Sequence, residues 1–167
     1  MVLQKLNFKV KGGEKIGIVR RTGAGKSTIS LALTRIIEIC GGYILIDGVS
    51  ISNICLEQVR DNITIIQQDP TLFTGTLRFN LDPIGSHSDQ SLLDLLESAG
   101  LSYLTERCQV PHFAEILNLE ISPNGDNFSS GEKSLICICR AILKRSKVVI
   151  LDEATANIDQ KTEERIQ

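Results

Sequence analysis

A glycine-rich stretch between an apolar run and a helical pattern limits the possible folds of this chain more than any other feature. Residues 23–28 read Gly-Ala-Gly-Lys-Ser-Thr and follow the apolar run of residues 16–19. After the stretch, apolar residues recur at helical spacing up to residue 37, and two glycines then end the pattern. A strand that turns into a helix through such a loop is a P-loop unit, which predicts an α/β fold.

The P-loop suits phosphate binding because successive backbone N–H groups at a helix N-terminus can surround phosphate oxygens. Lys26 can neutralise the outer oxygens, and the Ser27 hydroxyl can bind Mg²⁺. The predicted nucleotide-binding residues of this loop are Thr22, Gly23, Ala24, Gly25, Lys26, Ser27 and Thr28. The alternative is a glycine-rich turn without a ligand, and the position between a strand and a helix argues against it.

Arg20 departs from the usual P-loop pattern, in which this position is glycine. Glycine lets the strand turn sharply into the loop, so an arginine must find a permitted φ or push the loop outward. One expectation is therefore weaker phosphate binding. The other, which we favour, is that the side chain turns to solvent or pairs with a carboxylate and leaves the downstream amides in place.

An apolar run followed by two acidic residues lies near the end of the sequence. Residues 148–151 read Val-Val-Ile-Leu and lead into Asp152 and Glu153. At the end of a buried strand, Asp152 can hold the Mg²⁺ shell while Glu153 polarises an attacking water molecule. The run resembles a Walker B motif with its catalytic glutamate, and together with the P-loop it indicates a nucleoside triphosphatase.

The remaining pattern predicts a largely parallel sheet with a helical insertion, because strands return after helices. Strands are expected at residues 2–10, 16–19, 43–46, 49–51, 63–66 and 148–151, with a hairpin turn at Asp47-Gly48. Helices are expected at residues 27–38, 91–98 and 129–144. We therefore expect one domain, with a nucleotide core at residues 1–68 and 145–167 and a helical subdomain at about residues 69–144.

Composition excludes several classes of function. The formal net charge is -2 with acidic and basic residues interspersed, so no nucleic-acid partner is expected. The five cysteines lack metal-ligand spacing, and their odd number argues against a disulfide framework. No apolar run approaches the length of a membrane span, so we expect any membrane association to come through other domains.

Two further stretches resemble the ATP-binding cassette (ABC) family. Residues 128–132, Phe-Ser-Ser-Gly-Glu, resemble the signature motif that the family writes Leu-Ser-Gly-Gly-Gln, and residues 151–159 extend the Walker B strand in the family's manner. Phenylalanine in the first place is familiar in the multidrug-resistance-associated branch, subfamily C. The resemblance implies that Ser129 and Gly131 contact ATP bound by an opposite domain, and a plain helix cap is the alternative for Ser129.

Glu132 departs from this motif because a charged side chain replaces an amide. We expect it to place a negative charge near a triphosphate. Such a charge disfavours binding unless Lys133 offsets it.

The resemblance assigns roles to two more positions. Residues 66–83 resemble the Q-loop and its continuation in the same branch, with Gln68 at the position that reaches Mg²⁺ and the attacking water. Residues 156–159 match the D-loop, which in the family crosses the dimer interface, and Asp159 is the residue carried over. Neither His87 nor His112 lies where the family's switch histidine comes, so both are expected at the surface.

The resemblance covers nearly the whole chain and implies a RecA-like P-loop NTPase core with a mostly parallel sheet, an antiparallel β edge and a helical signature subdomain. It implies an incomplete nucleotide-binding domain, similar to the second one of a subfamily C transporter, with the adenine-stacking aromatic and the switch histidine outside these residues. Glu153 and Gln68 are then the catalytic residues, while Ser27, Gln68 and Asp152 hold Mg²⁺ beside ATP. The implied partners are a second ABC nucleotide-binding domain, in cis or in trans, and transmembrane domains at whose cytosolic face ATP hydrolysis powers transport.

This interpretation has two alternatives. A degenerate or truncated cassette binds nucleotide or a partner domain without turnover, and Arg20, Glu132 and the missing switch histidine favour it. An ABC-type ATPase of chromosome maintenance or DNA repair carries a long coiled coil between its motifs, and no such heptad run exists in this sequence.

Overall fold

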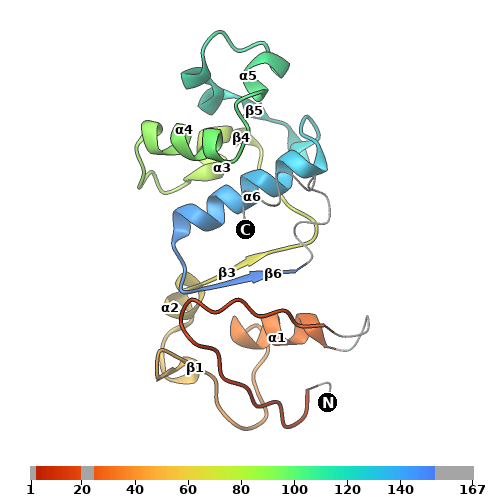
Figure 1. Ribbon diagram of the computed structural model, residues 1–167, viewed down its shortest axis with the longest axis vertical. Coiled ribbons are helices and arrows are strands. Elements are labelled where there is room, and N and C mark those ends of the chain that lie inside the picture. Colours follow the sequence, from red (N-terminus) through yellow and green to blue (C-terminus); the bar gives the residue numbers. More distant parts are fainter. Residues whose placement is uncertain (1–2, 20–24, 153–167) are drawn as a thin grey trace. The chain divides into compact units, whose positions relative to one another are not determined.

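The structure is a computed structural model that describes residues 3–19 and 25–152 (Figure 1). It divides into two compact units, residues 1–63 and 64–167, and each is described by itself. The predicted division into a core and a helical subdomain stays a prediction. None of the helices in the described ranges has the length and apolarity needed to cross a membrane.

The first unit is built around a short helix and a hairpin. Helix α1 spans Lys26–Leu33, and the antiparallel strands β1 (Leu45–Ile46) and β2 (Val49–Ser50) follow it. The turn between them places Asp47 and Gly48 at φ of 49° and 79°, as the predicted hairpin requires. A 3-10 turn, η1 (Ile51–Asn53), and helix α2 (Leu56–Asp61) complete the unit.

Helix α1 ends earlier than predicted. The sequence pattern extends the helix to residue 38, but the structure stops it at Leu33, with Thr34 as C-cap and Arg35 left-handed at φ 51°. The Arg35 Nη1 atom donates to the carbonyl oxygens of Ile51 (3.1 Å) and Ile54 (2.9 Å). These distant contacts favour a turn at a position where the apolar spacing favours more helix.

The predicted strands at residues 2–10 and 16–19 are wrong for the described residues, because the structure assigns no strand between residues 3 and 19. The segment does turn where expected, since the Glu14 N–H donates to the Lys11 carbonyl (3.1 Å) and the Lys11 N–H donates to the Glu14 carboxylate (2.8 Å). The apolar side chains on either side of this turn are about half exposed, as at Phe8 and Ile16. Alternating apolar residues form a strand only where a neighbouring strand takes up their hydrogen bonds.

The second unit contains a pair of strands, one of which leads into the predicted Walker B acids. Strand β3 (Ile63–Ile66) pairs with β6 (Val148–Leu151), and their arrows run in the same direction in Figure 1. The hydroxyls of Thr64 and Ser146 lie 2.6 Å apart at the start of the pair. Helix α6 (Ser130–Lys144) leads into β6 and packs Ile138 and Ala141 against Ile66. The predicted helix and strand are confirmed at this point, and so is the parallel sheet of the predicted fold class.

The rest of the second unit is mainly helical and surrounds one apolar core. Its elements are β4 (Gly75–Thr76), α3 (Leu77–Leu81), α4 (Asp89–Ser98), α5 (Leu104–Arg107), η2 (Phe113–Asn118), β5 (Glu120–Ile121) and η3 (Pro123–Gly125). The strands β4 and β5 pair antiparallel. Helix α4 confirms the predicted apolar stripe, because Leu92 and Leu96 are fully buried in the core together with Leu135 and Ile136 of α6. The core therefore joins the helical segment to the helix that begins at the signature motif.

Candidate nucleotide-binding site

The P-loop is described from Gly25 onward, so Arg20, Thr22, Gly23 and Ala24 lie outside the described residues. Gly25 is the N-cap of α1 and is left-handed, with φ 93° and ψ 19°. Glycine takes this conformation without a Cβ clash, and it offers no side chain that could accept a bond from the first amides of the helix. The N-terminal amides of α1, including those of Ser27 and Thr28, thus receive no side-chain cap from that position, as an anion site requires.

The ends of β3 and β6 bring together two of the predicted site residues. The Asp152 N–H donates to the Ile66 carbonyl at 3.0 Å, so Asp152 lies beside the residue two positions before Gln68. Gln68 is exposed and Asp152 half-buried. A carboxylate and an amide oxygen from two adjacent strand ends are hard oxygen donors of the kind Mg²⁺ takes with water and phosphate. Among the described residues, no group of three or more histidine, cysteine, aspartate or glutamate side chains is arranged to hold a metal ion.

Glu153 and Asp159 follow Asp152 and lie outside the described residues. Their predicted roles therefore stay predictions. The described part of the Walker B segment ends on Asp152, at the same end of the strand pair as Gln68.

The signature segment begins helix α6 with a capping box. The Glu132 N–H donates to Ser129 Oγ at 3.3 Å, and the Ser129 N–H donates to Glu132 Oε2 at 2.7 Å. Ser129 is therefore the helix cap that the alternative interpretation proposes, while its own O–H remains a donor. Both Ser129 and Ser130 are exposed, and Gly131 is half-buried.

The expectation that Glu132 faces a triphosphate is wrong. Its side chain is 4% exposed and turned into the second unit, where it accepts a hydrogen bond from the Tyr103 hydroxyl (2.8 Å) and pairs with Arg107 Nε (3.2 Å). Lys133 does not offset this charge, because its Nζ atom donates to the Asn124 carbonyl at 2.8 Å. The carboxylate is turned inward because a cation, a hydroxyl and a backbone amide meet it there.

The segment before the signature is fixed by its own polar contacts. The Asn127 Oδ1 atom accepts from the N–H and hydroxyl of Ser122 at 3.1 and 3.0 Å, and Asn127 Nδ2 donates to the Glu120 carbonyl at 2.8 Å. Next to it, Gly125 is left-handed at φ 68°, and a Cβ there would lie 3.1 Å from Leu72. The chain thus enters α6 from a closely packed loop.

The segment after Gln68 is held by residues that the sequence pattern does not single out. The Asn80 side chain accepts from the Phe73 N–H (2.8 Å) and donates to the carbonyls of Phe73 (2.8 Å) and Thr76 (3.0 Å). Arg140 of α6 donates to the Thr71 carbonyl at 2.8 Å and to both oxygens of Asn80, and it lies over the Phe73 ring at 5.5 Å. One signal for Asn80 was available, because it lies between Leu77 and Leu81, which predict a buried helix face.

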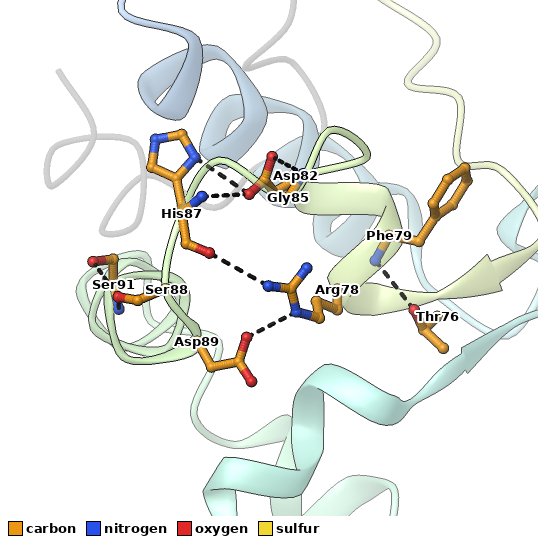
Figure 2. A network of polar contacts seen from close by, with 9 residues as sticks. All are labelled: Thr76, Arg78, Phe79, Asp82, Gly85, His87, Ser88, Asp89 and Ser91. Atoms are coloured by element: carbon orange, nitrogen blue, oxygen red, sulfur yellow. Dashed lines mark hydrogen bonds and ion pairs between the residues drawn. The ribbon is translucent and has the colours of Figure 1, made fainter.

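Asp82 organises the loop between α3 and α4 (Figure 2). Its carboxylate accepts from the N–H groups of His87 (2.7 Å) and Gly85 (3.1 Å). Burial raises the pKa of this carboxyl, but hydrogen bonds from His87, Ser86 and Gly85 and the charge of His87 outweigh it, so the pKa lies below its ordinary value. His87 Nδ1 lies 3.4 Å from Asp82 Oδ2, and His87 is half-buried. His112 is exposed as predicted.

Comparisons with known proteins agree with these motifs. The family model described as ABC transporter matches residues 3–156. The chain is 47% identical over its whole length to ATP-binding cassette sub-family C member 3 of Rattus norvegicus and 44% identical to sub-family C member 2 of the same species, of which it covers 11% and 10%. It is 48% identical to multidrug resistance protein mrp-7 of Caenorhabditis elegans, again over all of the chain and 11% of that protein. The chain thus spans about a tenth of the length of the curated relatives it matches.

A solved structure gives the same result for the fold. A bacterial Atm1-family ABC exporter with ATP bound superposes with a TM-score of 0.76 at 30% identity, over 87% of this chain and 25% of the exporter chain. The P-loop NTPase fold class predicted from the sequence is therefore confirmed. With a family match over nearly all of its residues and relatives of sub-family C along its whole length, the chain belongs to the ABC transporter family.

Proposed function

We propose that this chain binds MgATP and hydrolyses it as the second nucleotide-binding domain of a subfamily C exporter. Its partners are another nucleotide-binding domain, in cis or in trans, and transmembrane domains, and it works at the cytosolic face of their membrane. The names of the relatives and the ATP bound in the similar exporter support this proposal. Hydrolysis then powers transport.

The observation that carries the proposal is the hydrogen bond between the Asp152 N–H and the Ile66 carbonyl. It brings the end of the Walker B strand beside the segment that leads to Gln68. Parallel strands present such side chains at one edge of the sheet, where α/β proteins bind their ligands. Within the first unit, a helix that begins at an uncapped glycine separately supports phosphate binding by the P-loop.

The roles follow from the chemistry of each group. The amides of residues 22–28 and the Lys26 ammonium hold the phosphates, and oxygens of Ser27, Gln68 and Asp152 hold Mg²⁺. When bound, Mg²⁺ neutralises charge on the phosphate oxygens. Glu153 accepts the proton of the attacking water, while Ser129 and Gly131 meet the ATP of the opposite domain and Asp159 lies at the interface.

Binding is tested by titrating a fluorescent ATP analogue with Mg²⁺ into the chain. Lys26→Ala removes the phosphate cation and should weaken binding by at least about tenfold, a loss on the order of 1.4 kcal/mol. Lys9→Ala is the matched control, because Lys9 is an exposed lysine of the same unit. Equal affinities for the parent and Lys26→Ala would refute the P-loop assignment.

Hydrolysis is tested separately, because Arg20 favours a second candidate function, a cassette that binds nucleotide without turnover. Glu153→Gln removes the proposed base, so it should reduce turnover by about 100-fold or more while MgATP affinity is retained. Glu57→Gln, at an exposed position of α2, is its control. Binding without any turnover by the parent chain would establish the second candidate, and tighter binding by Arg20→Gly would show that Arg20 weakens the phosphate site.

A further inference from the structure

Glu132 makes two hydrogen bonds to Ser129 within the signature motif. Its Oε2 atom accepts the Ser129 N–H at 2.7 Å, and its own N–H donates to Ser129 Oγ at 3.3 Å. A carboxylate in the first turn also interacts favourably with the positive end of the helix. The Glu132 side chain therefore fixes the Ser129 backbone, while the backbone N–H of Glu132 meets the Ser129 hydroxyl.

The charge of Glu132 is balanced by helix α5 and the residue before it. Arg107 Nε lies 3.2 Å from Glu132 Oε1, and the Tyr103 hydroxyl donates to the same oxygen at 2.8 Å. Arg107 also lies over the Phe128 ring at 5.3 Å and donates to the Asn127 carbonyl at 3.2 Å. One arginine thus holds the two residues that precede Ser129 as well as the acid that follows it.

These contacts leave a defined set of groups directed to solvent. The Ser129 N–H is occupied by the Glu132 carboxylate, and the carboxylate itself is 4% exposed. The Ser129 hydroxyl accepts from the Glu132 N–H, so its proton stays available for donation outward. Ser129 and Ser130 are exposed at this end of the helix. The negative charge is thereby kept away from the surface on which a phosphate would bind.

We propose that Glu132 is a positioning residue: with Tyr103 and Arg107 it fixes the backbone of Ser129 at the start of α6, so that the Ser129 hydroxyl is held toward the terminal phosphate of ATP bound by the opposite nucleotide-binding domain. The proposal rests on the proposed function. It assigns Glu132 an inward role in place of a phosphate contact, so the departure from the family's glutamine is compatible with activity. Glutamine keeps an oxygen for the Ser129 N–H, whereas alanine does not.

The test compares Glu132→Ala, Glu132→Gln and the control Glu106→Ala, an exposed glutamate of α5. In the nucleotide-free chain, amide hydrogen exchange of Ser129 measured by NMR should become at least about tenfold faster in Glu132→Ala and stay within about threefold in Glu132→Gln. With MgATP, Glu132→Ala should lower turnover by about tenfold while the affinity of the chain's own P-loop changes by less than about twofold. Glu132→Gln and the control Glu106→Ala should keep turnover near that of the parent chain.

A milder variant keeps the test decisive if Glu132→Ala unfolds. Tyr103→Phe removes one hydroxyl, and it should raise Ser129 exchange and lower turnover in the same direction by about two- to fivefold. Unchanged Ser129 exchange in Glu132→Ala or Tyr103→Phe overturns the inference, as does an equal loss of turnover in Glu132→Gln and Glu132→Ala. A parent chain that fails to bind MgATP contradicts only the proposed function, because the exchange comparison still decides whether Glu132 positions Ser129.

Discussion

Replacing Asn80 with alanine should destabilise the second unit substantially. The Asn80 side chain, in a residue that is 2% exposed, makes three hydrogen bonds to the backbone of Phe73 and Thr76 and one to Arg140. Each neutral bond contributes about 1 kcal/mol net, and the charged one somewhat more. Arg140 keeps its bond to Thr71, and water reaches the segment around the exposed Phe73, so we expect a net loss of about 3 kcal/mol.

The assay uses the tyrosines of a chain that has no tryptophan. Of its two tyrosines, Tyr43 is exposed in the first unit, so Tyr43→Phe leaves Tyr103 as the reporter of the second unit. In urea unfolding at neutral pH, Asn80→Ala should lower the free energy of unfolding by about 3 kcal/mol, with a fall in Tm of about 6–12 °C. Asn118→Ala, at an exposed position of η2, should stay within about 0.5 kcal/mol. A loss below about 1 kcal/mol in Asn80→Ala would refute the view that this side chain holds the segment after Gln68.

Three further outcomes are expected from the described contacts. The pKa of Asp82 in the folded chain lies below its ordinary value of 3.8, so its ionised form stabilises the fold above that pH. The parent chain should therefore have a higher Tm than Asp82→Asn by a constant amount from about pH 5 to 7, and this difference should vanish as the pH falls further below 3.8. Burial, together with the neighbouring Cys137 thiol, raises the pKa of Cys139 to about 12. In a thiol-reagent titration at about pH 8, Cys139 should therefore react only after unfolding, well after the exposed Cys40. Gly125→Ala should lower the urea midpoint more than Gly85→Ala, because both are left-handed but only the first meets neighbours within 3.2 Å; equal losses would contradict this.

Local signals predicted the elements whose ends are determined by adjacent residues. Helix α6 has Ser129 as its N-cap and ends at Lys144, as its capping pattern and amphipathic spacing indicate. The hairpin at Asp47-Gly48 follows from turn chemistry alone, because both residues tolerate positive φ. In each case the residues that decide the structure lie within a few positions of it.

Elements that depend on distant partners were not predictable in the same way. The end of α1 is set partly by Arg35 reaching Ile51 and Ile54, which lie 16 and 19 positions further along the chain, beyond the β1–β2 hairpin. The polar contacts of Asn80 and Arg140 join residues 60 positions apart. No local pattern encodes such pairs, and the alternating apolar residues 3–10 likewise do not become a strand without a hydrogen-bonded neighbour.

Glu132 shows how the same limit affects the interpretation of a motif. Within the five signature residues, an acid in place of an amide is an added charge near phosphate, and the adjacent Lys133 is the only apparent compensation. In the structure the compensation comes from Tyr103 and Arg107, which lie in a different helical segment, and Lys133 bonds elsewhere. Burying a carboxylate costs little free energy when a cation, a hydroxyl and an amide are its partners, and the negative charge then lies away from the surface. The effect of a departure from a motif therefore depends on the direction of the side chain, and that direction is decided by residues outside the motif.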